Sequence, residues 1–169
     1  MTMGVSVSQL EKMVFWDNTA DHELENAESI DTRFGKVKLN KKNAISFPRG
    51  LLGMPDKRSF FITNFPSEKL SKFKMLQCTD DHGLSFITLP VGLYNGIITT
   101  EDLTFACKEL GILPDNLLVL LMVSVHRTPT KVSISVNARA PLMVDSSLRL
   151  AAQYVFQTDK YKVQHYITA

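Results

Sequence analysis

Hydrophobic and polar side chains alternate along residues 131–145, KVSISVNARAPLMVD. The even positions are all apolar, whereas the odd positions include Ser, Asn, Arg, Pro and Asp. A period of two predicts a β-strand with one face on a core and the other facing water or a partner. Pro141 cannot donate a backbone hydrogen bond, so we expect this strand to lie at a sheet edge or to bend there. The small Ala138 and Ala140 favour a place where a barrel closes or another segment crosses.

Other segments also have the composition of strands. Residues 60–65 and 84–89 are rich in β-branched and aromatic side chains and are bounded by turn-forming residues. Residues 117–123, LLVLLMV, are apolar at odd and even positions alike, which indicates a strand buried on both faces or a short buried helix. Along residues 34–47, apolar positions alternate with polar ones on either side of KKN. We interpret this segment as a hairpin with a lysine-rich outer face.

Only one helix has clear boundary signals. In TTEDLTFACKELGI, Thr99 precedes Asp102 by three residues, the spacing of an N-terminal cap, and Gly111 follows the last apolar position at helical spacing. Strand patterns dominate the rest of residues 33–169. The sequence therefore predicts a mainly β fold, a small antiparallel β-barrel-like domain with one short helix.

Residues 47–54, FPRGLLGM, predict a sharply specified turn. Two of the chain's eight glycines stand three residues apart, around an apolar pair and between two prolines. Glycine reaches backbone angles that cost other residues energy, and proline fixes its own φ. Such a turn either joins two strands or forms a site. We favour the structural role, carried by Phe47, Pro48, Gly50, Leu51 and Gly53. A binding role would fall to the flanking Arg49 and Met54.

Charge divides the chain into two parts. Residues 1–32 hold seven acidic side chains and one basic one, a net charge of −6, while residues 33–169 hold 18 basic and 10 acidic side chains, a net charge of +8. We expect residues 1–32 to form an acidic, flexible arm and residues 33–169 a single domain. The apolar cluster MVFW contains Phe15 and Trp16 and interrupts the arm. Loose packing of one or two of these side chains on the body is the favoured interpretation, and contact of Phe15 and Trp16 with a partner is the alternative hypothesis.

The sequence lacks the signals of most enzymes. It contains no nucleophile elbow, glycine-rich phosphate loop or histidine-glutamate zinc motif. In TDDHG, the side chains of Asp80, Asp81 and His82 could bind a cation, but adjacent acids before a glycine are more typical of a hairpin turn with a solvated tip. We therefore expect no catalysis, no metal and no cofactor.

Cysteine usage and hydropathy suggest the compartment. Cys78 and Cys107 have no metal-ligand spacing, and we expect two reduced, buried thiols in a reducing cytosol. No apolar run approaches the roughly 20 residues of a membrane-spanning helix. We expect a cytoplasmic protein that stays in solution.

RNA binding is an alternative to protein binding. A basic body with ten Phe and four Tyr could form a small RNA-binding β-barrel, with bases stacked on exposed rings and lysines on phosphates. Most phenylalanines fall on the apolar positions of the predicted strands, however, where they would form the core.

An ordered set of segments resembles the FliW family of flagellar assembly factors. FPRGLLGMPDKRSFFI is similar to the family's opening motif. MLQCTDDHGLSFITLP, with Gln77, is similar to its Leu-Gln-Ser-x-Asp segment, which leads into a hydrophobic strand and a proline. TTEDLTFACKELGI resembles its short helix, VSISVNARAPLMVDSS its Ala-Pro strand, with Ala140 and Pro141, and QYVFQTDKYKVQHYI its closing strand. The resemblance runs from about Phe34 to Ile167.

This resemblance implies a non-catalytic adaptor. FliW-like proteins bind CsrA, a regulator that represses translation of flagellin mRNA, and they also bind flagellin, so nucleic acid is affected only indirectly. Family members tend to be acidic, whereas this body is basic, the arm is an addition, and LRLAAQYVF lacks a glycine usual before the last strands. The charge difference implies an apolar contact, a contact made by the arm, or a changed partner.

Geometry suggests two places for a partner to bind. We first expect binding at Asn137 and Arg139, on the solvent face of the alternating strand beside its proline-weakened edge, because edges invite strand addition. The loop of Asp80, Asp81 and His82 is the second expectation.

Overall fold

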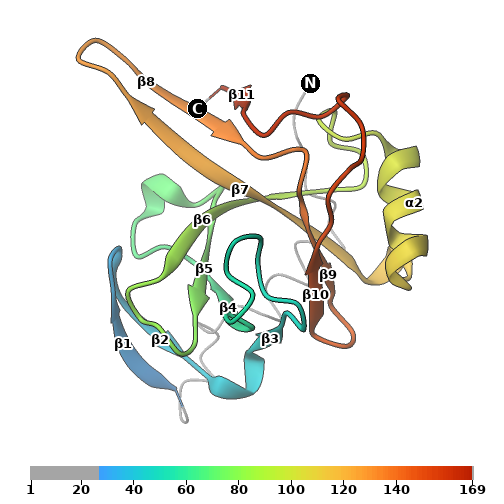
Figure 1. Cartoon of the computed structure of the whole chain (residues 1–169). Coiled ribbons are helices and arrows are strands. Elements are labelled where there is room, and N and C mark those ends of the chain that lie inside the picture. The colour runs from blue at the N-terminus through green and yellow to red at the C-terminus, as the bar shows by residue number, and fades with distance from the viewer. Residues whose placement is uncertain (1–26, 169) are drawn as a thin grey trace.

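The computed structural model describes residues 27–168, and most of their strands wind around a common interior (Figure 1). One α-helix lies within this range, which confirms the predicted mainly β fold. In chain order the elements are β1 (Glu28–Thr32), β2 (Gly35–Leu39), η2 (Lys41–Asn43), β3 (Ile45–Ser46), β4 (Ser59–Thr63), η3 (Glu68–Leu70), β5 (Lys74–Cys78), β6 (Ser85–Val91), α2 (Thr100–Leu110), η4 (Pro114–Asn116), β7 (Leu117–Arg127), β8 (Val132–Val136), β9 (Leu142–Asp145), β10 (Leu150–Gln153) and β11 (His165–Ile167), where η marks a short 3-10 helix.

The barrel closes at β7. This long strand pairs with β6 along one side, and its first residues also pair with β9. The remaining pairings complete the ring in the order β6, β5, β4, β3, β10 and β9. All of them are antiparallel except the single parallel position of Leu150 opposite Ser46. Closure removes most free strand edges from this part of the molecule.

Two apolar clusters lie on opposite faces of the barrel wall. The inner cluster draws on every barrel strand and includes Phe47, Phe60 and Leu120. The outer cluster packs α2 and the β1–β2 sheet against the wall and includes Leu103 and Leu121. Because β7 contributes alternate residues to both clusters, its apolar run Leu117–Leu121 is fully buried. The strand buried on both faces, predicted from LLVLLMV, is confirmed.

The predicted long strand of residues 131–145 is broken into β8 and β9. The chain bends through residues 137–141, which confirms the bend expected at Pro141. The expectation of one solvent-facing side is wrong for β9, where all four residues are buried. Met143 belongs to the outer cluster, while Leu142 and Val144 belong to the inner one. This strand lies between two other barrel strands and between two apolar layers, so neither face reaches water.

The predicted hairpin of residues 34–47 is replaced by a different pairing. β2 pairs with β1, and KKN forms the turn η2 that leads into β3. Val37 and Leu39 are buried while the lysines between them are exposed, so the alternation itself was interpreted correctly. The arm boundary also moves, because Glu28–Thr32 is strand β1 and Ile30 is buried in the outer cluster. Residues 28–32 therefore belong to the folded domain, because Ile30 packs in the outer cluster.

The helix α2 begins and ends where its capping residues predict. The Thr99 side chain accepts a hydrogen bond from Asp102 N at 3.2 Å, and Gly111 ends the helix with a φ of 71°. Figure 1 shows α2 beside the barrel, with the β7–β8 hairpin projecting on the other side of the molecule and β11 next to β8. Both cysteines are buried and free, as predicted. Within residues 27–168, no helix is long and apolar enough to cross a membrane.

Candidate protein-binding groove

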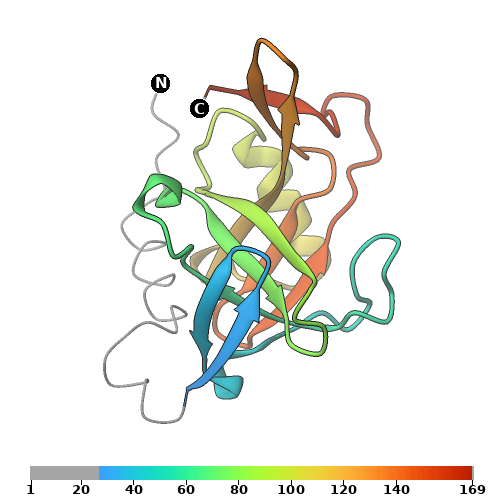
Figure 2. The ribbon, with the colours of Figure 1, turned by 90° about the vertical axis from the view of Figure 1, so that its left-hand side faces the viewer.

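The turn of residues 47–54 is fixed by its two glycines. Gly50 has a φ of 66° and Gly53 a φ of 78°, the left-handed region that glycine enters without strain. Leu51 and Met54 pair across the turn, with N–O distances of 3.2 and 2.8 Å. Phe47 and Leu51 are buried in the inner cluster, as the structural interpretation predicted. The turn projects outward from the barrel (Figure 2).

A groove of about 880 Å³ lies between this turn, β10 and the C-terminal end of α2. Its lining includes three leucine side chains that stay largely in water: Leu52 is 57% exposed, Leu148 65% and Leu150 42%. Neighbouring exposed apolar side chains around one concave surface are characteristic of binding sites rather than of ordinary protein surface. The groove therefore suits an apolar ligand or segment.

The floor of the groove contains the open edge of β10. Tyr154 N donates to Pro141 O at 2.9 Å, and Gln153 lies opposite Leu142. In this antiparallel register, Gln153 and Leu142 are a non-hydrogen-bonded pair, so the backbone N–H and C=O of Gln153 point away from β9. On that side β10 pairs with β3 only at Leu150, within the part of the chain described. An extended segment could add to this edge.

Two side chains hold the walls of the groove together. The Gln153 side chain accepts a hydrogen bond from Leu52 N at 2.9 Å and donates one to Ala140 O at 3.2 Å, so it connects the turn to the bend. The Tyr154 hydroxyl donates to the Glu109 carboxylate of α2. That bond, with burial and the negative charge of Glu109, raises the pKa of Tyr154 to about 12. The contact fixes β10 relative to the helix.

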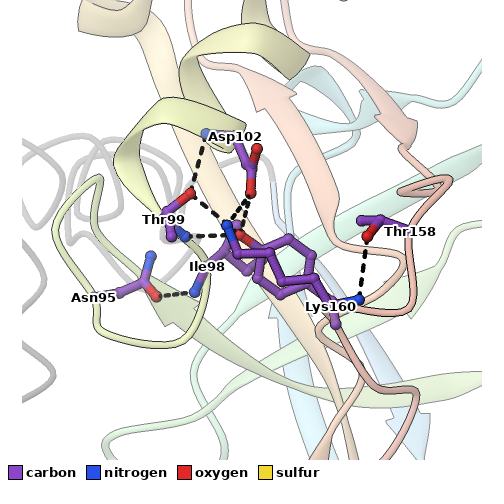
Figure 3. Close-up of polar contacts among 7 residues, drawn as sticks. Asn95, Ile98, Thr99, Asp102, Thr158 and Lys160 are labelled. Carbon is purple, nitrogen blue, oxygen red and sulfur yellow. Dashed lines mark hydrogen bonds and ion pairs between the residues drawn. The ribbon is translucent and has the colours of Figure 1, made fainter.

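The helix that forms one wall is anchored at its other end by a polar network (Figure 3). Asp102 accepts hydrogen bonds from the Tyr161 hydroxyl and, at 2.9 Å, from Lys160 Nζ. Thr99 N donates to the same hydroxyl at 3.1 Å. The hydrogen bonds from Tyr161 and then Lys160 lower the pKa of Asp102. The loop after β10 therefore holds the start of α2 through Tyr161 and Lys160, and Tyr154, directly after β10, holds its end.

The predicted binding residues of the turn have different environments. Arg49 is exposed and lines the groove. Met54 is partly buried against the inner cluster, which gives it a structural environment. Pro48 also lines the groove.

The loop of residues 79–84 is a hairpin turn between β5 and β6, as favoured from the sequence. Gln77 is buried below it and donates to the backbone oxygens of Asp81 and His82, both at 3.2 Å. The Asp81 carboxylate accepts from Gly83 N and lies 3.5 Å from Lys57 Nζ, which ties this loop to the chain just after the 47–54 turn. Asp80 is exposed. Residues 27–168 contain no group of three or more potential metal ligands.

The bend of residues 137–141 is held by Asn137. Its side-chain oxygen accepts from Arg139 N at 3.1 Å and from Ala140 N at 3.0 Å. Arg139 lies 3.9 Å from the Asp159 carboxylate and is partly exposed. Ala140 and Pro141 are buried. Asn137 thus has a structural environment, while Arg139 retains an accessible side chain. The remaining predicted pair, Phe15 and Trp16, lies outside the described residues.

Sequence reasoning missed the other wall and the floor of the groove. Leu148 and Leu150 alternate with Arg149 after β9, and two leucines separated by a charged residue in a polar stretch were the available signal. Gln153 gave no signal, because its partners are far away in the sequence. The described part of the chain is thus a closed β-barrel with an apolar groove beside an open strand edge.

Comparison with known proteins identifies the family of this β-barrel. The sequence profile of the FliW protein family matches residues 28–167, and the chain belongs to this family. The flagellar assembly factor FliW of Ruminiclostridium cellulolyticum is 32% identical over 142 residues, covering 80% of this chain and 90% of the relative. The FliW of Geotalea uraniireducens is 29% identical over 138 residues, covering 79% and 80%.

A solved structure supports the fold. The crystal structure of a flagellar assembly factor FliW superposes with a TM-score of 0.63 at 19% sequence identity, covering 82% of this chain and 96% of that one. At this identity the likeness establishes the fold alone. The family match begins at Glu28, where β1 begins.

Proposed function

We propose that this protein is a non-catalytic flagellar assembly factor that binds a CsrA-type translational regulator and flagellin. Binding of the regulator would prevent it from gripping flagellin mRNA and so relieve repression. Flagellin would remove the protein from the regulator, because the two partners compete for one surface or couple negatively. Family membership over residues 28–167 supports this role.

The observation that carries the proposal is the groove with its open β10 edge. Exposed leucines surround the edge, so an incoming extended segment gains both backbone hydrogen bonds and apolar burial. The charge of the body, +8 over residues 33–169, makes an apolar and backbone-mediated contact the better match to a basic regulator, since like charges repel. Flagellin would use the same groove or an adjoining surface.

Isothermal titration with the regulator and with flagellin from the same source tests the proposal. We expect each to bind, RNA to be excluded from the regulator, and flagellin to reverse the first interaction. Leu148→Glu should weaken binding at least tenfold, because it places a charge in the groove. Leu113→Glu is the matched control, because Leu113 is 67% exposed but does not line the groove. Equal effects of the two variants would contradict a partner site in the groove.

The basic body also favours a second candidate, direct RNA binding. Lysine and arginine contacts to phosphates release counterions, so such binding weakens steeply as salt rises. An RNA titration at several salt concentrations distinguishes the two candidates. RNA affinity with a steep salt dependence, together with no binding of either protein, would replace the adaptor by the RNA-binding module.

A further inference from the structure

We propose that the segment Met13–Trp16 of this same chain binds in the groove and acts as an internal competitor for it. The segment reads MVFW and is followed by the acidic tract of residues 17–31. It lies outside the described residues. The apolar groove, the contacts between the start of β1 and the groove wall, and charge complementarity favour this occupant. Its binding there does not depend on the identity of any partner.

The groove is suited to an apolar segment in an extended conformation. Leu52 and Leu148 are more than half exposed, and Leu150 nearly half. Covering apolar surface stabilises a contact by about 25 cal/mol per Å². The outward N–H and C=O of Gln153 can pair with the backbone of an added strand. Met, Val, Phe and Trp are the side chains that such a surface binds best.

Polar contacts connect the start of the described chain with a wall of the groove. The Glu28 carboxylate lies 3.5 Å from Lys41 Nζ. The next residue, Lys42, accepts a hydrogen bond at its backbone oxygen from Arg149 Nη1. Arg149 stands between the two groove leucines Leu148 and Leu150. Two polar contacts therefore lead from the start of β1 to the groove wall.

The linker between Trp16 and Glu28 is long, and its charge is opposite to that of the body. Eleven residues lie between Trp16 and Glu28, and an extended chain of that length spans about 40 Å. The linker carries acidic side chains at 17, 21, 23 and 25. Basic side chains are present at the groove: Arg49 lines it, and Arg149, which donates to Lys42 O, lies between Leu148 and Leu150 in the sequence. Charge complementarity between this tract and the basic body favours the intramolecular contact.

Tethering makes even a weak contact effective. A short flexible linker gives its segment an effective concentration in the millimolar range. A partner that uses the groove would then bind only the fraction of molecules in which the segment has left, and its apparent affinity would fall by that fraction. High salt would loosen the segment, because the acidic linker and the basic body attract each other less.

Trp16 provides the test, because it is the only tryptophan of the chain. In the full-length protein without any partner, we expect blue-shifted Trp16 emission and protection from an uncharged quencher such as acrylamide. Leu148→Glu and, separately, Leu52→Glu should shift the emission to that of tryptophan in water and raise the quenching constant severalfold. Leu113→Glu should change neither quantity. Circular dichroism checks that all three variants remain folded, as expected for substitutions at exposed positions.

Each alternative outcome overturns the proposal. Emission typical of exposed tryptophan in the wild-type protein would show that the segment is not bound. Protection that survives both groove variants would place Trp16 elsewhere on the body. Protection that disappears on dilution would mean that the groove holds the segment of a second copy. All these readouts are free of partner, so their failure is separate from any failure of the proposed function.

Discussion

The 47–54 turn and the 137–141 bend do the same task by different means. Both redirect the chain next to β10, and both contact Gln153, whose side chain accepts from Leu52 N and donates to Ala140 O. The turn depends on backbone angles, because Gly50 and Gly53 have positive φ. The bend depends on a side chain, because Asn137 accepts two backbone N–H groups. The turn can be recognised in the sequence by its glycines. The bend depends on the Asn137 side-chain oxygen, which must lie close to Arg139 N and Ala140 N.

The largest loss of stability is expected from a substitution at Gly50. A Cβ there would lie 2.5 Å from Met54 O and 2.7 Å from Pro55 Cα, and alanine would also hold a left-handed φ. Gly50→Ala should therefore lower the free energy of unfolding by about 3 to 5 kcal/mol. Gly53→Ala is the control, because it has a similar φ and no atom within 4 Å of the added Cβ, and it should cost about 1 kcal/mol. Urea unfolding of both variants measures the difference, and equal losses would show that φ alone matters.

The second largest loss of stability is expected from a substitution at Asn137. Replacing it with alanine removes an acceptor shared by Arg139 N and Ala140 N, which should cost about 2 kcal/mol. For a protein of this size, thermal unfolding would then shift by several degrees, at about 2–4 °C per kcal/mol. Asn137→Asp keeps an oxygen at the same place and should restore most of the loss. A loss that aspartate does not restore would mean that the amide group has a further role.

A smaller effect is expected at Gln153, which joins the two turns. Gln153→Met has a similar size but loses both the acceptor for Leu52 N and the donor for Ala140 O, at an expected cost of about 1 kcal/mol. Gln153→Glu keeps only the acceptor and should fall between wild type and Gln153→Met. A double-mutant cycle with Asn137→Ala measures how strongly the bend depends on this link. Strict additivity would mean that the two turns are independent.

Sequence predicted the two turns to different depths. The 47–54 turn was interpreted correctly, because glycine and proline carry their own backbone preferences. Pro141 predicts the bend, but the hydrogen bonds of the Asn137 side chain to Arg139 N and Ala140 N could not be predicted, since they exist only once the chain has turned. In β9, Met143 occupies a predicted outward position yet is buried, because a barrel with layers on both sides of its wall leaves no solvent face there.

The groove could be predicted least. Its walls come from segments about 40 to 100 residues apart, and Leu52 meets Gln153 across a separation of 101 residues. The local sequence shows whether a residue is apolar. It does not show whether a distant segment of the chain will cover that residue in the folded protein. Leu148 and Leu150 are recognisable as an apolar pair in a polar stretch, but the sequence does not show whether such a pair is buried or exposed. Their exposure depends on where α2 and the turn lie.

The smallest loss of stability is expected at Asp102, which anchors the start of α2. Unlike the two turns, this anchor depends on a charged side chain. Asp102 accepts from Tyr161 and Lys160, and its pKa is lowered by these bonds. Its contribution to stability is therefore present above the ordinary aspartate pKa and is lost as pH falls through the lowered one. The Asp102 side chain is 36% exposed, so screening keeps its contribution to stability below about 1 kcal/mol.

Urea unfolding from pH 6 down to about pH 2 should show a shallower loss of stability for Asp102→Asn than for wild type. Tyr161→Phe removes the stronger of the two donors and should flatten the same curve in part, whereas Gln153→Met should leave its slope unchanged, since neither turn depends on a titrating group. An unchanged slope in Asp102→Asn would show that this carboxylate does not stabilise the start of α2.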